Sequence, residues 1–149
     1  MKRIFDFLSK FIQKNVDADH QAIATATDSN LSHMSAIAID QMRTSSFGVN
    51  LICGFEGKRL LAYDDSVGVW SIGFGTTLYP NGIRVKKGDS CTESQAKAYM
   101  THDLKRFETI VNNKVTVPLN QNQFDALVSL AYNIGATAFS QSTLVKKLN

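Results

Sequence analysis

The stretch EGKRLLAYDDSVGVWSIGFGTT, residues 56–77, decides the fold, because the pattern of apolar side chains changes from helical to strand-like across it. Before it, residues 45–55 place apolar side chains at helical spacing behind Ser45 or Ser46, either of which can cap a helix. Within it, large apolar and small residues alternate, which predicts a strand with one face formed by Trp70, Ile72 and Phe74. The sequence therefore predicts a helix followed by a β-hairpin.

Two carboxylates and a hydroxyl in this stretch, those of Glu56, Asp65 and Ser71, are candidates for catalysis. Hydrolysis of a glycosidic bond needs one carboxylic acid to protonate the leaving oxygen and a second carboxylate to orient water or stabilise the cationic sugar. Glu56 ends the predicted helix beside apolar neighbours, which favours its protonated form, whereas Asp65 lies in a loop and is expected to stay ionised. Ser71 lies on the small-residue face of the strand. The topology can bring all three to one cleft.

Glycines flank this group of residues. Gly73 and Gly75 remove side chains from the strand face, which we interpret as room for a sugar to approach the backbone. Farther along, Asn81-Gly82 predicts a tight hairpin turn.

The rest of the chain has the pattern of amphipathic helices. Thr92 with Gln95, and Asn120 with Gln123, each form a capping box at the start of an apolar stripe. Gly135 is expected to end the second of these helices, and a short helix is expected within residues 142–149. The fold class predicted is therefore α+β, with a small helix and hairpin lobe and a mainly helical second lobe.

Bulk composition limits the classes of function. The chain has 149 residues, is 44% hydrophobic and carries a net charge of +3, which suits one domain with an appendage and is too weak and dispersed for a nucleic-acid partner. No apolar stretch approaches the roughly 20 residues of a membrane-spanning helix. The cysteines and histidines show no metal-ligand spacing, so neither a zinc site nor a disulfide framework is predicted.

The chain divides at about Arg43 into two unlike parts. For residues 1–42 the pattern predicts an amphipathic helix over residues 1–15 and a linker of weak structure, whereas residues 43–149 carry the catalytic pattern and the positive balance. The helix has three open interpretations: packing on this protein or a partner, attachment to a membrane surface through residues 2–15, or a degenerate export signal.

The string E-G-x-x-L-x-A-Y-x-D-x-V-G-V-W-S-I-G-x-G-x-T, from Glu56 to Thr77, resembles the active-site signature of the phage lysozymes, or endolysins, of glycoside hydrolase family 24. The resemblance covers residues 43–149 and extends through TESQA and VPLNQNQFDALVSLAYNIG, which are similar to the lambdoid branch of that family. It implies a glycan bound between two lobes that a long helix joins.

The resemblance also implies an activity and its residues. Glu56 matches the family's proton donor, Asp65 rather than Asp64 its second carboxylate, and Ser71 its catalytic-site threonine. The family cleaves the β-1,4 bond between N-acetylmuramic acid and N-acetylglucosamine in peptidoglycan, without metal or cofactor. The implied location is the host bacterial cytoplasm, with action on the wall in the periplasm after membrane passage.

The chain departs from the family pattern at several places. Ser71 keeps the hydroxyl of the usual threonine, and Thr76 replaces a common histidine, a position we expect to tune structure or substrate contact rather than chemistry. Relatives continue beyond Asn149, so we expect a C-terminally truncated second lobe in which the apolar faces of residues 124–131 and 144–148 lose cover. The N-terminal helix or a second copy could supply that cover. The alternative function is a catalytically weak wall-binding or virion-associated structural protein.

Overall fold

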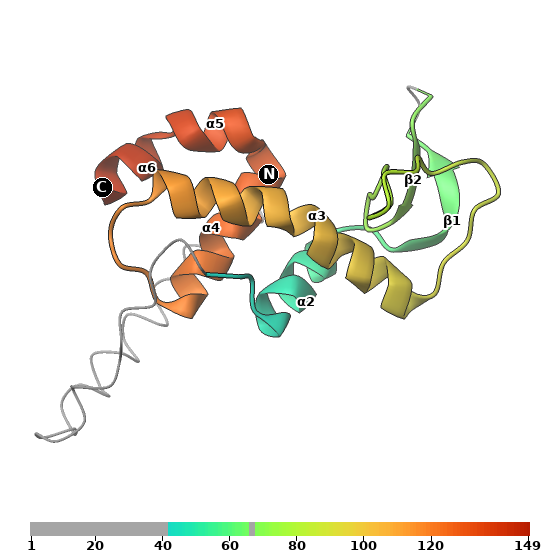
Figure 1. The fold of residues 1–149 in the computed structure, drawn as a ribbon, viewed down its shortest axis with the longest axis horizontal. Helices are drawn as coiled ribbons and strands as arrows, with labels where there is room; N and C mark the ends of the chain where they lie inside the picture. The colour runs from blue at the N-terminus through green and yellow to red at the C-terminus, as the bar shows by residue number, and fades with distance from the viewer. Residues whose placement is uncertain (1–41, 66–67) are drawn as a thin grey trace, which may run out of the picture.

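The computed structural model describes residues 42–65 and 68–149. They form a small lobe with a two-stranded sheet and a mainly helical second lobe, and one long helix runs from the first to the second (Figure 1). In chain order, the elements are α2 (Ser46–Phe55), β1 (Arg59–Asp64), β2 (Trp70–Gly73), α3 (Glu93–Lys114), α4 (Gln121–Ile134), α5 (Ala136–Gln141) and α6 (Thr143–Leu148). The predicted α+β class is confirmed. The helix and linker predicted within residues 1–41 lie outside the described residues.

Helix α2 links the two lobes at the start of the described chain. Ser45 is its N-cap, because the Ser45 hydroxyl accepts the Gly48 N–H at 3.0 Å. The Ser45 N–H in turn donates to Asp125 on α4 at 3.0 Å, so the start of α2 is tied to the helical lobe. A Cβ at Gly48 would lie 2.5 Å from the Asp125 side chain, so this contact requires glycine.

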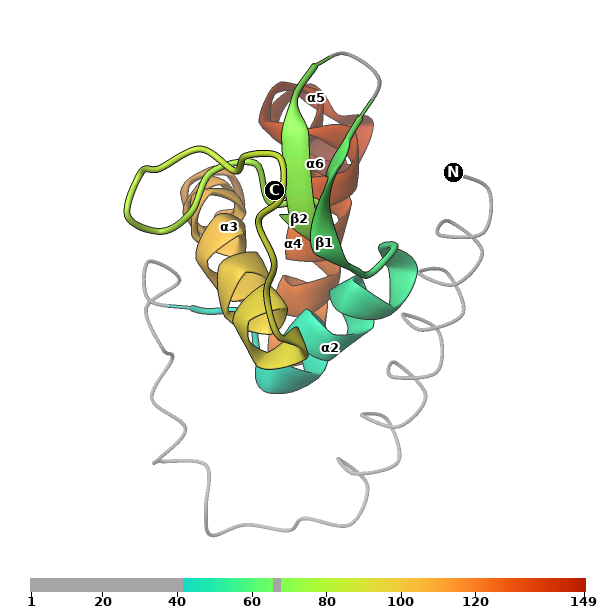
Figure 2. The ribbon, with the colours of Figure 1, turned by 90° about the vertical axis from the view of Figure 1, so that its right-hand side faces the viewer.

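The hairpin is shorter than the sequence predicts. β1 and β2 pair antiparallel with Arg59 opposite Gly73 and Tyr63 opposite Ser71, and the register shifts between Arg59 and Tyr63. Gly73 and Gly75 have φ of +67° and +102°, which turn the chain and end the strand. The turn at Asn81-Gly82 is confirmed, since Tyr79 N–H donates to Ile83 C=O at 2.8 Å across it. Figure 2 shows the loop between β2 and α3 curving out beside α3.

Both predicted capping boxes are present. At Thr92 and at Asn120, the side chain accepts the N–H of the residue three positions on, and the glutamine there accepts the cap's own N–H. α4 ends at Gly135, whose φ is +85°, as predicted. The short helix expected within residues 142–149 is present as α6, whereas α5 is a helix that the sequence analysis does not include.

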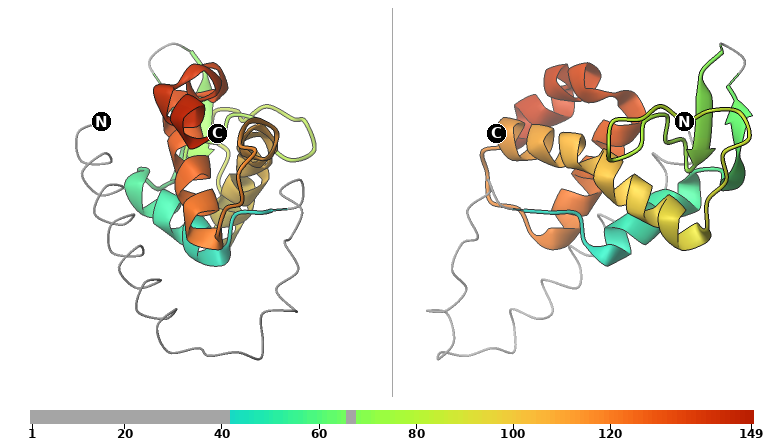
Figure 3. Two further views of the ribbon diagram at one scale, coloured as in Figure 1. Left: turned by 90° about the vertical axis from the view of Figure 1, so that its left-hand side faces the viewer. Right: turned by 45° about the vertical axis from the view of Figure 1, so that its right-hand side comes forward.

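The helical lobe is better covered than expected. Phe124, Val128 and Ala131 on α4 are 0% exposed, because α4 packs against α2, α3 and α5 (Figure 3). The prediction that residues 124–131 lack cover is therefore wrong. On α6, Val145 is buried, and only Leu144 remains an exposed large apolar side chain. No helix of the described residues is long and apolar enough to cross a bilayer.

Candidate active site

Glu56 directly follows the last residue of α2 and precedes the first strand of the hairpin. The helix ends at Phe55, and Glu56 has extended backbone angles while its N–H still donates to the Ile52 carbonyl at 3.3 Å. The side chain is half-buried between the lobes, and this burial raises the pKa of the Glu56 carboxyl above its ordinary value. The structure thus gives Glu56 the environment that favours a protonated acid.

Asp65 and Ser71 lie on the two arms of the same hairpin. Asp65 is exposed directly after β1, where its N–H donates to Val69 C=O and its carboxylate accepts the Val69 N–H, both at 3.2 Å. Ser71 is 4% exposed on β2, opposite Tyr63. The chain order and pairing place Glu56 at the base of the hairpin, Ser71 along it and Asp65 toward its far end. Residues 66–67 at its tip lie outside the described residues.

Tyr132 on α4 faces this base from the helical lobe, and it was not among the residues expected from the sequence. Its hydroxyl donates to the Phe74 carbonyl at 3.2 Å. Burial raises the pKa of Tyr132, and the negative charge of Glu56 adds to this rise. Tyr132 continues the apolar stripe of α4, which made it indistinguishable from a core aromatic residue in the sequence.

Thr76 and Asp103 form a second tie between the lobes. The Thr76 hydroxyl donates to the Asp103 carboxylate at 2.6 Å, and Thr76 is 2% exposed. Thr76 therefore has a structural contact, in keeping with the role expected for it. Asp103 lies on the polar side of α3, and nothing in its spacing marked it in the sequence.

The two glycines of the strand have different surroundings. A Cβ at Gly73 would meet the Ala96 Cβ at 3.0 Å, so the missing side chain makes room for α3. The interpretation that Gly73 makes room for a sugar is therefore wrong. Gly75 instead lines an open space, in which its nearest contact for an added Cβ is the Tyr132 hydroxyl at 3.8 Å.

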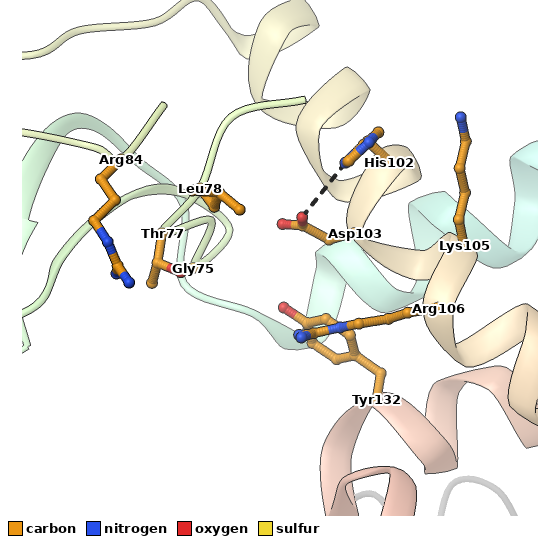
Figure 4. A pocket seen from close by; sticks show the side chains of 9 residues that line it. All are labelled: Gly75, Thr77, Leu78, Arg84, His102, Asp103, Lys105, Arg106 and Tyr132. Carbon is orange, nitrogen blue, oxygen red and sulfur yellow. Dashed lines mark ion pairs between the residues drawn. The ribbon is translucent and has the colours of Figure 1, made fainter. Parts of the chain in front are cut away.

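That space is a cavity of about 470 Å³ between the loop after β2, helix α3 and helix α4. Figure 4 shows Gly75 and Thr77 on one side of it, with Asp103 and Arg106 on α3 and Tyr132 on α4 on the other. Tyr132 therefore both lines the cavity and contacts the base of the hairpin, through its hydrogen bond to the Phe74 carbonyl. Among the described residues, no cluster of His, Cys, Asp and Glu is arranged to hold a metal ion.

Comparisons with known proteins agree with this arrangement. Residues 53–149 match the family model described as phage lysozyme. The chain is 44% identical over 108 residues to an endolysin of Acyrthosiphon pisum secondary endosymbiont phage 1, covering 72% of this chain and 70% of that protein. An endolysin of Salmonella phage P22 is 43% identical over 108 residues, which are 72% of this chain and 74% of the relative.

Solved structures give the same result. A crystal structure of a P22 lysozyme mutant superposes with a TM-score of 0.69 at 41% identity, covering 73% of this chain and 75% of that one. The muramidase domain of SpmX from Asticaccaulis excentricus gives a TM-score of 0.66 at 40% identity, covering 73% and 71%. The matching segment contains the helix end, the hairpin and the helical lobe described above. The chain belongs to the phage lysozyme family.

Proposed function

We propose that this chain is a muramidase that hydrolyses the β-1,4 bond between N-acetylmuramic acid and N-acetylglucosamine in the host wall, within the lambdoid branch of glycoside hydrolase family 24. Family membership supports a lysozyme-type glycoside hydrolase, and the relatives named endolysin and muramidase support the substrate and its use in lysis. The observation that carries the proposal is the half-buried Glu56, with its raised pKa, at the base of the hairpin that bears Asp65 and Ser71.

In this proposal, Glu56 donates the proton to the leaving glycosidic oxygen. Burial penalises its charged form, so a larger share of the carboxyl is protonated near neutral pH than in an exposed glutamate. Asp65, exposed at the hairpin, is the carboxylate that stabilises the cationic sugar or orients water. Ser71 offers a hydroxyl that holds the water, with less stiffness than a threonine because it lacks the β-branch.

The first experiment measures new reducing ends released from purified peptidoglycan by wild type and by Glu56→Gln. The glutamine keeps the shape and cannot donate the proton, so we expect kcat to fall by roughly 10²- to 10⁴-fold. Glu93→Gln is the matched control, because Glu93 is an exposed glutamate that pairs with Lys58 at 2.7 Å. Equal rates for wild type and Glu56→Gln would refute the assigned role. Wild type that binds the wall without releasing reducing ends would favour the structural alternative.

The neighbouring aspartates provide a second comparison. Asp64 accepts the Gly68 N–H at 3.1 Å, much as Asp65 accepts the Val69 N–H, and both are exposed. Asn at either position can still accept these hydrogen bonds, so the two substitutions differ mainly in which charge is removed. We expect Asp65→Asn to lower kcat strongly and Asp64→Asn to leave most of it. The reverse order would reassign the second carboxylate.

We further propose that residues 43–149 are the catalytic domain and that residues 1–42 are a separate segment, with residues 2–15 contacting a membrane surface. The basic amphipathic pattern of the segment supports this assignment. The enzyme would be made in the host cytoplasm and reach the periplasmic side of the wall after membrane passage. Deletion of residues 2–15 should reduce binding to anionic vesicles while peptidoglycan hydrolysis in vitro continues. Unchanged vesicle binding would remove the membrane role.

A further inference from the structure

A tight turn at residues 72–76 directly follows Ser71. The Ile72 N–H donates to the Thr76 carbonyl at 2.9 Å, and the Thr76 N–H donates back to the Ile72 carbonyl at 3.0 Å. The Gly75 N–H also donates to the Ile72 carbonyl, at 3.2 Å. Ile72 is fully buried, so packing and hydrogen bonds together fix the first residue of the turn. Because one planar peptide bond joins Ser71 to Ile72, the backbone of Ser71 follows the position of the turn.

Two side chains of the helical lobe hold this turn. The Thr76 hydroxyl donates to the Asp103 carboxylate of α3 at 2.6 Å, and the Tyr132 hydroxyl of α4 donates to the Phe74 carbonyl at 3.2 Å. Thr76 is buried, so its hydrogen bond forms away from bulk water. Since a hydrogen bond to a carboxylate is stronger than one between neutral groups, the bond from Thr76 is the firmer of the two. Figure 4 shows Asp103 and Tyr132 directed toward the loop that carries Gly75.

The pairing of Ser71 with the other strand restrains it much less. Ser71 lies opposite Tyr63 on β1. None of the residues of β1 is buried, and the register of the two strands shifts between Arg59 and Tyr63. Exposed elements with few buried contacts open more easily than the core does. The turn at residues 72–76, rather than β1, therefore sets where Ser71 lies relative to the helical lobe.

Glu56 is held by contacts with the same lobe. It directly follows α2, whose start is bonded to α4 by the Ser45 N–H, which donates to Asp125 at 3.0 Å. A misplacement of about 1 Å between catalytic groups can lower a rate roughly 10²-fold. The Ser71 hydroxyl is sensitive to such a shift, because serine lacks the β-branch that restricts a threonine side chain. The separation of Glu56 and Ser71 therefore depends on how firmly the turn is bonded to the helical lobe.

We propose that Thr76 and Asp103 are positioning residues, which hold the Ser71 hydroxyl in place relative to Glu56. This inference rests on the proposed function, in which the Ser71 hydroxyl holds the water. Thr76 is buried and is not among the described residues that line the 470 Å³ cavity, so it acts through the turn and not on the substrate. The expected signature is a fall in kcat with little change in KM.

The first test measures kcat and KM for release of reducing ends from soluble, uncross-linked peptidoglycan strands, at a temperature where each variant is folded. Thr76→Val keeps the shape and removes the donor, so we expect kcat to fall about tenfold and KM to change by less than about twofold. Thr76→Ser keeps the donor and should bring kcat to within about threefold of wild type. A rise in KM in place of the fall in kcat would overturn the proposal, because it would indicate a substrate contact.

The charge of Asp103 is tested separately, because Asp103 also lines the cavity. Asp103→Asn removes the charge and keeps an acceptor for the Thr76 hydroxyl, so kcat should stay within about threefold of wild type. If Asp103→Asn loses kcat while Thr76→Val keeps it, Asp103 acts through its charge and the proposal is wrong.

A double variant tests whether Thr76 acts through Ser71. Ser71→Ala should lower kcat roughly 10²-fold. Ser71→Ala/Thr76→Val should lie no more than about twofold below Ser71→Ala, because the position of an absent hydroxyl has no effect. A further tenfold fall, about the effect expected of Thr76→Val alone, would overturn the proposal, since Thr76 would then act on another group.

Val145→Ala is the control for a general loss of stability. Val145 is buried on α6, so the substitution removes buried methyl groups and leaves the turn intact. It should lower the unfolding midpoint and keep the wild-type kcat. An equal fall in kcat for Val145→Ala, or a wild-type kcat for Thr76→Val, would overturn the inference and leave the muramidase function intact. Wild type that releases no reducing ends would contradict the proposed function instead.

Discussion

Strand β1 and helix α4 lie on opposite sides of the candidate site and differ sharply in how they are packed. None of the six residues of β1 is buried, whereas eight of the fourteen residues of α4 are. Asp65 and Ser71 are carried by the hairpin, and Tyr132, which donates to the Phe74 carbonyl at the hairpin base, by α4. The candidate site therefore joins a thinly covered hairpin to a helix that belongs to the core.

This difference shows which contacts hold the hairpin in position. Ile72 and Phe74 are buried at the end of β2, Gly73 packs on Ala96 of α3, and Tyr132 donates to the Phe74 carbonyl. The hairpin is thus held at its base, next to Glu56, while its far end near Asp65 is exposed. Substitutions can test whether the base of the hairpin is packed and whether its strand β1 is exposed.

The largest expected effect is in the helical core. Leu104 on α3 is 0% exposed, and Leu104→Ala should lower the free energy of unfolding by about 2–5 kcal/mol, since it removes buried methyl groups and leaves a cavity. Leu61 on β1 is 69% exposed, and Leu61→Ala should change stability by less than about 0.5 kcal/mol. Urea unfolding of both variants measures the difference. Similar losses would mean that β1 is covered in solution.

A smaller loss is expected at the base of the hairpin. Gly73→Ala places a Cβ at a φ of +67° and 3.0 Å from the Ala96 Cβ, so strain and overpacking add to about 2–3 kcal/mol. Gly82→Ala, at a φ of +82° with nothing within 4 Å, should lose only the strain of about 1–2 kcal/mol. The two unfolding free energies are compared directly. A greater loss at Gly82 would contradict the packing of Gly73 on α3.

Gly73 also shows how far the sequence allowed the structure to be predicted. The capping boxes at Thr92 and Asn120, a helix cap at Ser45 or Ser46, which the structure places at Ser45, and the turn at Asn81-Gly82 are local features, and the structure confirms them. Local hydrogen bonds within a few residues fix such features, so their sequence signals are sufficient. The contact between Gly73 and Ala96 joins residues far apart in the chain, and spacing alone cannot reveal it.

The same difference between local signals and long-range contacts applies to the candidate site. Glu56, Asp65 and Ser71 lie in one continuous stretch, so a local pattern and the family resemblance it carries could propose them. Tyr132 and Asp103 reach the site only because α4 and α3 pack beside the hairpin. A tyrosine in an apolar stripe and an aspartate on a polar helix face are common in any helical protein. Their roles become visible only when the lobes are placed together.

The tie between Thr76 and Asp103 should have an intermediate effect on stability. Thr76→Val keeps the shape and removes the 2.6 Å hydrogen bond to Asp103, which should cost about 1–2 kcal/mol. Thr109→Val is the control, because the Thr109 hydroxyl is exposed and bonds only within its own helix, to Lys105 C=O. Thermal unfolding should separate the two variants. If they unfold alike, the loop after β2 is held to α3 by packing alone.

The smallest expected effect is the pH dependence of stability at Glu56. Burial raises the pKa of Glu56 in the folded chain above its ordinary 4.5, so folding favours the protonated form. The stabilisation by this group is then fully present below about pH 4.5 and is lost as the pH rises through the folded pKa. Gln cannot ionise, so Glu56→Gln should be more stable than wild type at pH 7, and the difference should vanish below pH 4.5.

Glu93 provides the matched control with the opposite sign. The hydrogen bond from Lys58 lowers the pKa of Glu93, so its stabilisation is present at pH 7 and is lost as the pH falls through the folded pKa. Glu93→Gln should therefore be less stable than wild type at pH 7, with a gap that closes in acid. Urea midpoints between pH 3 and 8 measure both variants. If the two substitutions shift stability in the same direction at pH 7, burial does not control Glu56, and the proton-donor role loses its physical support. Opposite shifts at pH 7 would show that burial raises the pKa of Glu56 while the hydrogen bond from Lys58 lowers the pKa of Glu93.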